Sequence, residues 1–137
     1  MHTTLTTPLA LPCGAVVPNR IVMAPMVVQG SDPADGHVTD EDVDYFSRRR
    51  GVAGMIVTGA AFVNRQGRGF ERQLSIAEDG AVEGLARMAA AMKKDGNLAI
   101  VQIYHGGREA HPAATEFGRA VAPSTTSSPG CPTCPRR

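Results

Sequence analysis

Hydrophobic residues gather in three short runs along the chain. They occupy residues 20–26 ("RIVMAPM"), 53–60 ("AGMIVTGA") and 98–105 ("LAIVQIYH"). Their length and their β-branched residues predict three strands. The second run is almost continuously apolar, which is typical of a strand covered on both faces. We expect Pro25 to end the first strand, because proline has no backbone N–H to donate.

The segments between these runs follow a helical period. The first helix is predicted to begin at Thr39, because Asp42 stands three residues later in a variant of the capping box, and to end at Gly51. The second is predicted to begin near Asp79. Its expected apolar stripe consists of Val82, Leu85, Ala86, Ala89 and Met92. The order β-α-β-α-β predicts an α/β fold with a parallel sheet and right-handed crossovers.

The remaining segments show neither the pattern of a strand nor the period of a helix. Residues 9–20 are expected to form a small hairpin around Cys13 and Gly14, and residues 125–137 an irregular tail. The loop that follows the second predicted strand is long for a compact domain, and such loops are usually functional or disordered.

Length and composition narrow the class of protein. The 137 residues suffice for one domain, and 42% hydrophobic and 20% charged residues are ordinary for a globular chain. The net charge of +1 provides no field for nucleic acid or an anionic membrane. The arginine run at residues 48–50 lies at the end of the first predicted helix, where a structural role is favoured. The N-terminus is a poor signal peptide, no run is long enough to span a membrane, and three unpatterned cysteines fit a cytoplasmic location.

Candidate chemistry is sought at the carboxyl ends of the three strands, where parallel α/β sheets bind ligands. Gln102 carries a donor and an acceptor on one planar amide, and a buried amide requires a partner. That partner is either a flat heterocycle or a neighbouring loop. The small residues 59–61 permit close approach by a packed helix or by a planar cofactor. Pro25 and Met26 have core packing as their default role.

For the other polar residues, a structural role is an alternative to a functional one. His105 suits a base or a metal ligand, and Arg108 a phosphate or carboxylate contact, but both residue types more often stabilise loops. Gly106 and Gly107 do not form a dinucleotide-binding fingerprint. Cys131 and Cys134 have the spacing of a zinc or redox pair but lack a second pair of ligands. We therefore expect no metal site.

Taken together, the strings "NRIVMAPM", "GMIVTGAAFVNRQGRG" and "VQIYHGGREA" with "VAPS" resemble the old yellow enzyme family of NAD(P)H:flavin oxidoreductases in order and spacing. The resemblance extends from about residue 9 to residue 124. It implies the N-terminal β-α-β-α-β portion of a TIM (β/α)8 barrel over residues 1–124, truncated after the third strand. It also implies FMN as cofactor, NAD(P)H as reductant and a small-molecule substrate, and it leaves homo-oligomerisation open.

The resemblance assigns roles to individual residues. Pro25, Met26 and Val27 are expected along the flavin, Ala60 beside its ring, and Gln102 at its pyrimidine edge, while His105 and Arg108 support the loop above. The chain departs from the family at two positions. Val27 stands where Thr or Cys is frequent, and Gly59 stands where an acid is common.

The catalytic residues of the family have no counterpart here. Its substrate-anchoring histidine pair or His/Asn pair, its tyrosine proton donor and its phosphate-binding arginine lie on later strands, and a full barrel needs about 250 residues. The sequence therefore indicates part of an FMN-dependent oxidoreductase that, when complete, transfers hydride from NAD(P)H to an activated alkene of the enone, enoate or dienoyl type. The alternative is a small non-catalytic α/β binding module.

Overall fold

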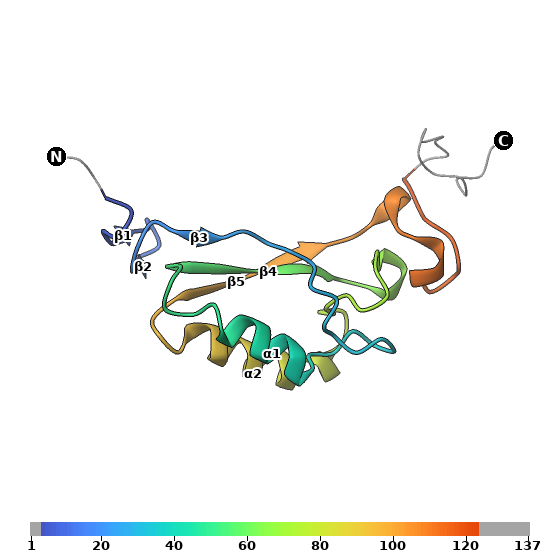
Figure 1. The fold of residues 1–137 in the computed structure, drawn as a ribbon. Coiled ribbons are helices and arrows are strands. Elements are labelled where there is room, and N and C mark those ends of the chain that lie inside the picture. The colour runs from blue at the N-terminus through green and yellow to red at the C-terminus, as the bar shows by residue number, and fades with distance from the viewer. Residues whose placement is uncertain (1–3, 124–137) are drawn as a thin grey trace.

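The computed structural model describes residues 4–123. A parallel sheet holds the strands in the order β3-β4-β5, with bounds Val22–Met23, Met55–Phe62 and Leu98–Tyr104. The helices α1 (Asp40–Ser47) and α2 (Val82–Lys93) lie side by side beneath one face of this sheet, and the other face is open (Figure 1). The predicted β-α-β-α-β order is confirmed.

The predicted hairpin near the N-terminus is also present. Strands β1 (Leu9–Ala10) and β2 (Val16–Val17) pair antiparallel, and Leu11 N donates to Ala15 O at 2.8 Å inside the turn. Gly14 has a φ of 86° at this turn, which glycine adopts without steric cost.

Strand β3 is much shorter than predicted. It forms ladder pairs at Val22 with Met55 and at Met23 with Ile56, and the chain leaves the ladder before Pro25. The register between β4 and β5 shifts between Val57 and Ala60, which marks a bulge. The strand pattern of residues 20–26 therefore continues past the point where pairing stops.

Helix α1 begins as predicted. Thr39 is its N-cap, and Thr39 N donates to Asp42 Oδ2 at 3.2 Å in a capping box. The helix ends at Ser47, so the arginine run follows it and does not fill its last turn. Arg49 Nη1 donates to Tyr45 O at 2.6 Å and Arg50 Nη1 donates to Ser47 O at 3.1 Å. The predicted structural role of these arginines is confirmed, because they satisfy carbonyls that the helix end leaves open.

Helix α2 follows a short 3-10 turn, Asp79–Ala81, close to the predicted start. Its buried face differs from the predicted stripe. Val82 and Ala86 are exposed, whereas Met88, which the predicted stripe omitted, is buried together with Met92. The stripe was wrong at these positions because the helix turns a face centred on Met88 and Met92 toward the sheet.

The core lies between the sheet and the two helices. Its buried members come from α1, the segment between α1 and β4, β4 itself, α2, and the long loop between β4 and α2: Phe46, Ala53, Ile56, Ala61, Leu74, Met88 and Met92. Met23 and Ala99, which flank Ile56 in the sheet, pack against this core as well. Because paired residues on neighbouring strands share a face, this row fixes which face of the sheet is covered. The opposite face carries the candidate site.

Candidate functional site

The structure brings the ends of the three strands together. The backbone of Met26 and Val27 lies directly against Gly59, and Ala60 pairs in register with Gln102 on the neighbouring strand. Met26, Ala60 and Gln102 therefore form one row across the carboxyl end of the sheet. Three segments that are far apart in the sequence meet at the edge where parallel sheets bind ligands.

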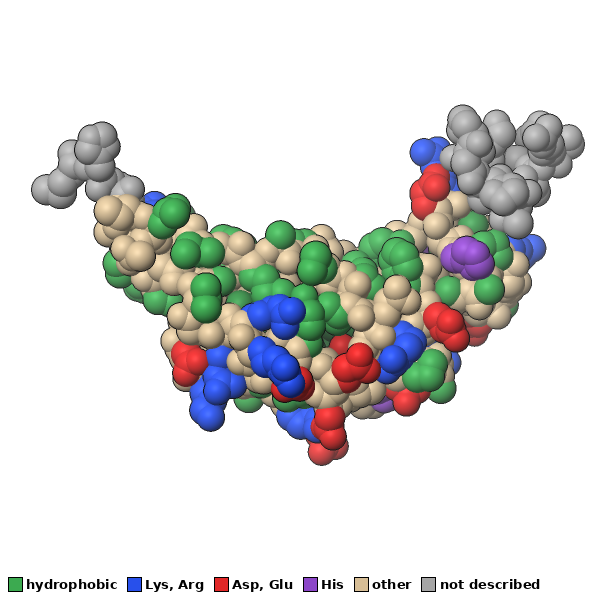
Figure 2. Space-filling view, viewed as in Figure 1, with side chains coloured by type: hydrophobic (Ala, Val, Ile, Leu, Met, Phe, Trp, Pro, Cys, Tyr) green, Lys and Arg blue, Asp and Glu red, His purple; other side chains and the backbone are tan. Residues whose placement is uncertain are grey.

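This row faces the open side of the sheet. Ala99 belongs to the core on the helix side, and Ile100 and Gln102 alternate with it along β5. Ala60, as the ladder partner of Gln102, shares its face. In the space-filling view, the molecule is hollowed along this upper side, and hydrophobic side chains lie in the hollow (Figure 2). Met26 and Gln102 are thus accessible to a ligand, whereas Ala60 is 8% exposed in the described chain.

Gln102 differs from the sequence expectation in one respect. Its side chain is exposed in the described chain, not buried, and its amide makes no hydrogen bond with the other residues of 4–123. Its backbone N–H donates to Thr58 Oγ1 at 3.2 Å, which holds the strand against β4 across the bulge. The neighbouring-loop partner is therefore absent within residues 4–123, and a planar amide with both functions free points into the open face.

Position 59 requires a glycine for a structural reason that the sequence did not reveal. A Cβ atom built there would overlap the carbonyl oxygen of Met26 and lie 3.0 Å from Val27 Cα. The bulky neighbour at this position is therefore the backbone of the first strand end, not a helix or a cofactor. An acidic side chain could not stand at position 59 without displacing Met26 and Val27.

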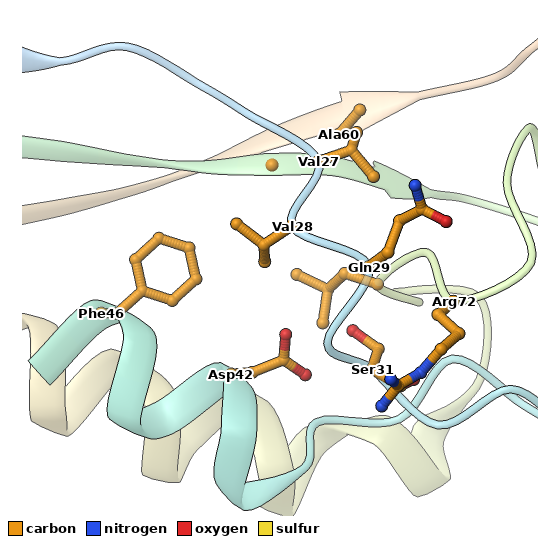
Figure 3. Close-up of a pocket in the computed structure, with 10 residues that line it drawn as sticks. Val27, Val28, Gln29, Ser31, Asp42, Phe46, Ala60 and Arg72 are labelled. Atoms are coloured by element: carbon orange, nitrogen blue, oxygen red, sulfur yellow. The ribbon is translucent and has the colours of Figure 1, made fainter.

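The side chains of Val27 and Val28, in the segment after β3, lie in two different environments. Val28 points toward Phe46 of α1, while Val27 points to the other side, near Ala60 (Figure 3). Gln29, the next residue, has a φ of 51° and is the single described non-glycine residue with a positive φ. Its side chain is exposed, and its amide is directed away from α1. This left-handed residue turns the chain away from the sheet toward α1.

A polar cluster beneath this segment, in which Ser31 and Asp42 are buried and Arg72 is partly exposed, was missed by the sequence reasoning. Arg72 donates through Nε to Ser31 O at 3.0 Å and through Nη2 to Gly30 O at 2.9 Å. Asp42, from α1, is 2% exposed and lies beside a cavity of about 10 Å³, room for about one water. Burial raises the pKa of the Asp42 carboxyl, and the hydrogen bonds from Thr39 N–H and the Ser31 side chain oppose that rise. The capping box could have identified Asp42, whereas no sequence signal identifies Arg72.

The loops above the row are locked together through small residues. The His105 ring lies against Gly67, where an added Cβ would be 2.5 Å from His105 Cδ2. Gly106 N donates to Gly67 O at 2.8 Å, and Gly107 N donates to His105 Nδ1 at 2.9 Å. His105 thus fixes the loop after β5 against the loop after β4. Arg108 is exposed and pairs with the adjacent Glu109 at 3.2 Å.

The two cysteines of the CxxC pair, Cys131 and Cys134, lie outside the described residues, as does the predicted tail at 125–137. Within residues 4–123 no group of three or more His, Cys, Asp or Glu side chains is placed to hold a metal ion. Neither α1 nor α2 has the length and apolar character of a membrane-spanning helix.

Comparison with known proteins identifies this arrangement. Residues 5–132 match the NADH:flavin oxidoreductase / NADH oxidase family, nearly the whole length of the chain. The chain belongs to this family. An uncharacterized oxidoreductase of Streptococcus pyogenes is 43% identical over 117 residues, which are 85% of this chain and 29% of that protein. The NADH:acrylate oxidoreductase of Vibrio harveyi is 44% identical over 114 residues, which are 83% of this chain and 11% of that protein.

Solved structures of the family have the same fold over the matched region. The old yellow enzyme from Trypanosoma cruzi superposes with a TM-score of 0.78 at 27% identity, over 89% of this chain and 35% of that one. The resemblance seen in the sequence is confirmed, and the sheet and helices are part of the TIM-barrel architecture of these enzymes. The chain spans about a third or less of the length of the proteins compared here.

Proposed function

We propose that residues 22–108 form one side of the FMN site of an NAD(P)H-dependent oxidoreductase that reduces activated alkenes. The observation that carries this proposal is the row of Met26, Ala60 and Gln102 on the open face, with the Gln102 amide free. A free planar amide beside a small side chain fits the imide edge of a flat heterocycle, because it can donate and accept side by side. Family membership supports flavin as that heterocycle.

Within such a site, the residues of this chain bind and orient. The Gln102 amide would pair with the pyrimidine edge, Ala60 would leave room for the ring, and Pro25, Met26 and Val27 would line its length. When bound, FMN supplies the hydride relay between a reduced nicotinamide and the alkene. Val27 offers no side-chain hydrogen bond, so the protein tunes the flavin at that position through packing and the backbone. No residue of this chain is proposed as a catalytic acid.

The proposed substrate class is inferred from the name of a relative. The Vibrio harveyi protein is named for acrylate, an alkene activated by a conjugated carboxylate. The enone, enoate and dienoyl classes share that activation, and this chain would leave the choice among them to residues elsewhere in the barrel. The alternative of a non-catalytic α/β module requires the open face to be covered, and the described residues leave it exposed.

A chimera tests the proposal. This chain replaces the matching 117 residues of the Streptococcus pyogenes relative, and bound FMN is measured by absorbance and by fluorescence quenching. We expect a yellow protein that consumes NADH or NADPH when acrylate or cyclohexenone is added. Gln102→Leu should weaken FMN binding about tenfold, because it leaves the flavin edge without one or two hydrogen bonds.

Two matched variants complete the experiment. Gln102→Asn keeps the amide but shortens its reach, so its effect should be intermediate. Val82→Leu changes an exposed position on α2, far from the row, and should leave FMN affinity unchanged. An unchanged FMN dissociation constant in the Gln102→Leu chimera would refute the proposed role of this residue.

A further inference from the structure

The segment that follows β3 contains two proposed flavin contacts and one strained residue. The backbone of Met26 and Val27 lies against Gly59 of β4, and two residues later Gln29 has a φ of 51°. A left-handed conformation is unfavourable for a residue with a side chain, so it persists only where the surrounding structure holds it. Whatever holds the turn at Gln29 therefore also holds Met26 and Val27 in place.

Three side chains hold the two residues that follow this turn. Arg72 donates to Gly30 O at 2.9 Å and to Ser31 O at 3.0 Å. Thr39 Oγ1 donates to Gly30 O at 2.7 Å. Asp42 accepts hydrogen bonds from Thr39 N–H, at 3.2 Å, and from the Ser31 side chain. We call Thr39, Asp42 and Arg72 the clamp, because together they fix the peptide units on one side of the turn.

Asp42 connects the clamp to the residues proposed to line the flavin. Its carboxyl is buried, and Oδ1 lies so close to Gly30 that a Cβ added there would be 2.9 Å away. The water-sized cavity beside this carboxyl is also lined by Val27, Gly59 and Ala60 (Figure 3). The carboxyl and the proposed flavin contacts therefore enclose the same small space, and a change in one is felt by the other.

The protonation of Asp42 changes the strength of the clamp. Burial raises the pKa of the carboxyl and Glu41 raises it further, whereas the hydrogen bonds from Thr39 and Ser31 and the charge of Arg72 lower it. Arg72 is the other charged residue that lines the cavity, and the remaining lining residues carry no charge. The ionised carboxyl accepts strongly through both oxygens, whereas the protonated acid carries a hydrogen on one of them and accepts more weakly. Protonation therefore loosens the bonds to Thr39 and Ser31.

We propose that Asp42 is a positioning residue of the flavin site, whose ionised form holds residues 29–31 in place and whose protonation lets residues 26–27 shift. The proposal deepens the proposed function and rests on it for the flavin, but the shift itself requires no ligand. Asp42 acts through the backbone of this segment. FMN affinity should therefore fall as Asp42 becomes protonated.

Nuclear magnetic resonance of the chain of residues 1–137 tests the shift without a ligand. As pH is lowered from about 7 toward 4 (near the unperturbed pKa), the amide signals of Met26 and Val27 should move with the midpoint of the Asp42 carboxyl signal. In Asp42→Asn, which keeps an acceptor but does not titrate, they should stay in place. Ser31→Ala serves if Asp42→Asn disturbs the fold: it removes a donor to the carboxyl, so the midpoint should move to higher pH. Amide signals that do not follow Asp42, or that move equally in Asp42→Asn, would overturn the proposal.

The chimera with the Streptococcus pyogenes relative tests the consequence for FMN. Over the same pH range, the FMN dissociation constant of the chimera should rise about three- to tenfold relative to that of its Asp42→Asn variant, the effect of one weakened hydrogen bond. The ratio of the two constants cancels the titration of the FMN phosphate, whose second pKa is about 6. A ratio independent of pH would overturn the proposal. If neither chimera bound FMN, the proposed function would fail, and the amide signals of the chain alone would still decide the role of Asp42.

Two arginines provide a matched comparison. Arg72 pairs with Glu41 and Arg87 with Asp40, both in the first turn of α1, but Arg87 does not line the cavity. Arg72→Gln removes a positive charge near Asp42, so it should raise the pKa of that carboxyl and weaken FMN binding by the chimera. Arg87→Gln should do neither. Equal effects of the two variants would show a general contribution to α1 and would also overturn the proposal.

Discussion

At the scale of single residues, Asp42 gives the clearest dependence on pH. Its carboxyl is buried, and burial raises its pKa above 3.8 in the folded chain. The folded state therefore binds this proton more readily than the unfolded state. The contribution of Asp42 to the free energy of unfolding is largest at low pH and is lost as pH rises from the unfolded pKa through the raised folded pKa.

The variant Asp42→Asn tests the direction of this pH dependence. The amide keeps an acceptor for Thr39 N–H but does not titrate, so the wild type should gain stability relative to the variant as pH is lowered toward 4 (about the unperturbed pKa). Urea unfolding at several pH values measures the difference, and a carbon-13 titration of the Asp42 carboxyl measures the pKa itself. A wild type that loses stability relative to Asp42→Asn on acidification would contradict the prediction.

Gln102 shows what a single residue can and cannot reveal in a sequence. Its position in an apolar strand marked it as a ligand candidate, because an amide needs partners. Its exposure could not be foreseen, since the sequence of β5 reads as buried while the described chain places nothing over that face. Arg72 was missed for the opposite reason. Its partners are two backbone carbonyls, 41 and 42 residues away, and the Glu41 carboxylate at 3.1 Å, and the sequence does not show which of these distant acceptors an arginine will meet.

At the scale of elements, hydrophobic runs predicted β4 and β5 well and overextended β3. The capping box predicted the start of α1, but the helix ends at Ser47 and not at the predicted Gly51. The pattern of residues 20–26 continues because Met26 and Val27 remain apolar, yet their backbone turns toward Gly59 and leaves the ladder. For α2, spacing alone could not choose between neighbouring faces of a helix rich in alanine. Packing against Phe46 and Ile56 selects the face of Met88 and Met92.

The contact between the first two strand ends predicts the effect of Gly59→Ala. The added methyl would overlap the Met26 carbonyl oxygen, so either β4 or the Met26–Val27 segment must move. We expect a loss of about 1–3 kcal/mol in the free energy of unfolding, the usual cost of overpacking. Gly96→Ala is the comparison, because Gly96 has open space around it and its φ of 84° brings backbone strain alone, about 1 kcal/mol. Equal urea midpoints for Gly59→Ala and the wild type would rule out the close approach.

At the scale of the whole molecule, the site is one-sided. Ala60 and Gln102 share the sheet face that the helices leave open, whereas small-molecule sites usually bury most of the ligand surface. We therefore expect the chain of residues 1–137 alone to bind FMN weakly or not at all, and to show no reductase activity. Fluorescence titration with FMN measures this. Stoichiometric flavin that is retained through purification would show that the chain completes the site by some other means.

The packing of His105 on Gly67 has a consequence for how this region can change over generations. A side chain at position 67 and an imidazole at position 105 exclude each other, because an added Cβ would be 2.5 Å from the ring. Position 67 cannot accept a side chain while the His105 ring keeps this place, although the two residues belong to loops 38 residues apart. A side chain at position 67 therefore requires the ring at position 105 to move or to be replaced by a smaller residue, so a change in one of these two loops involves the other.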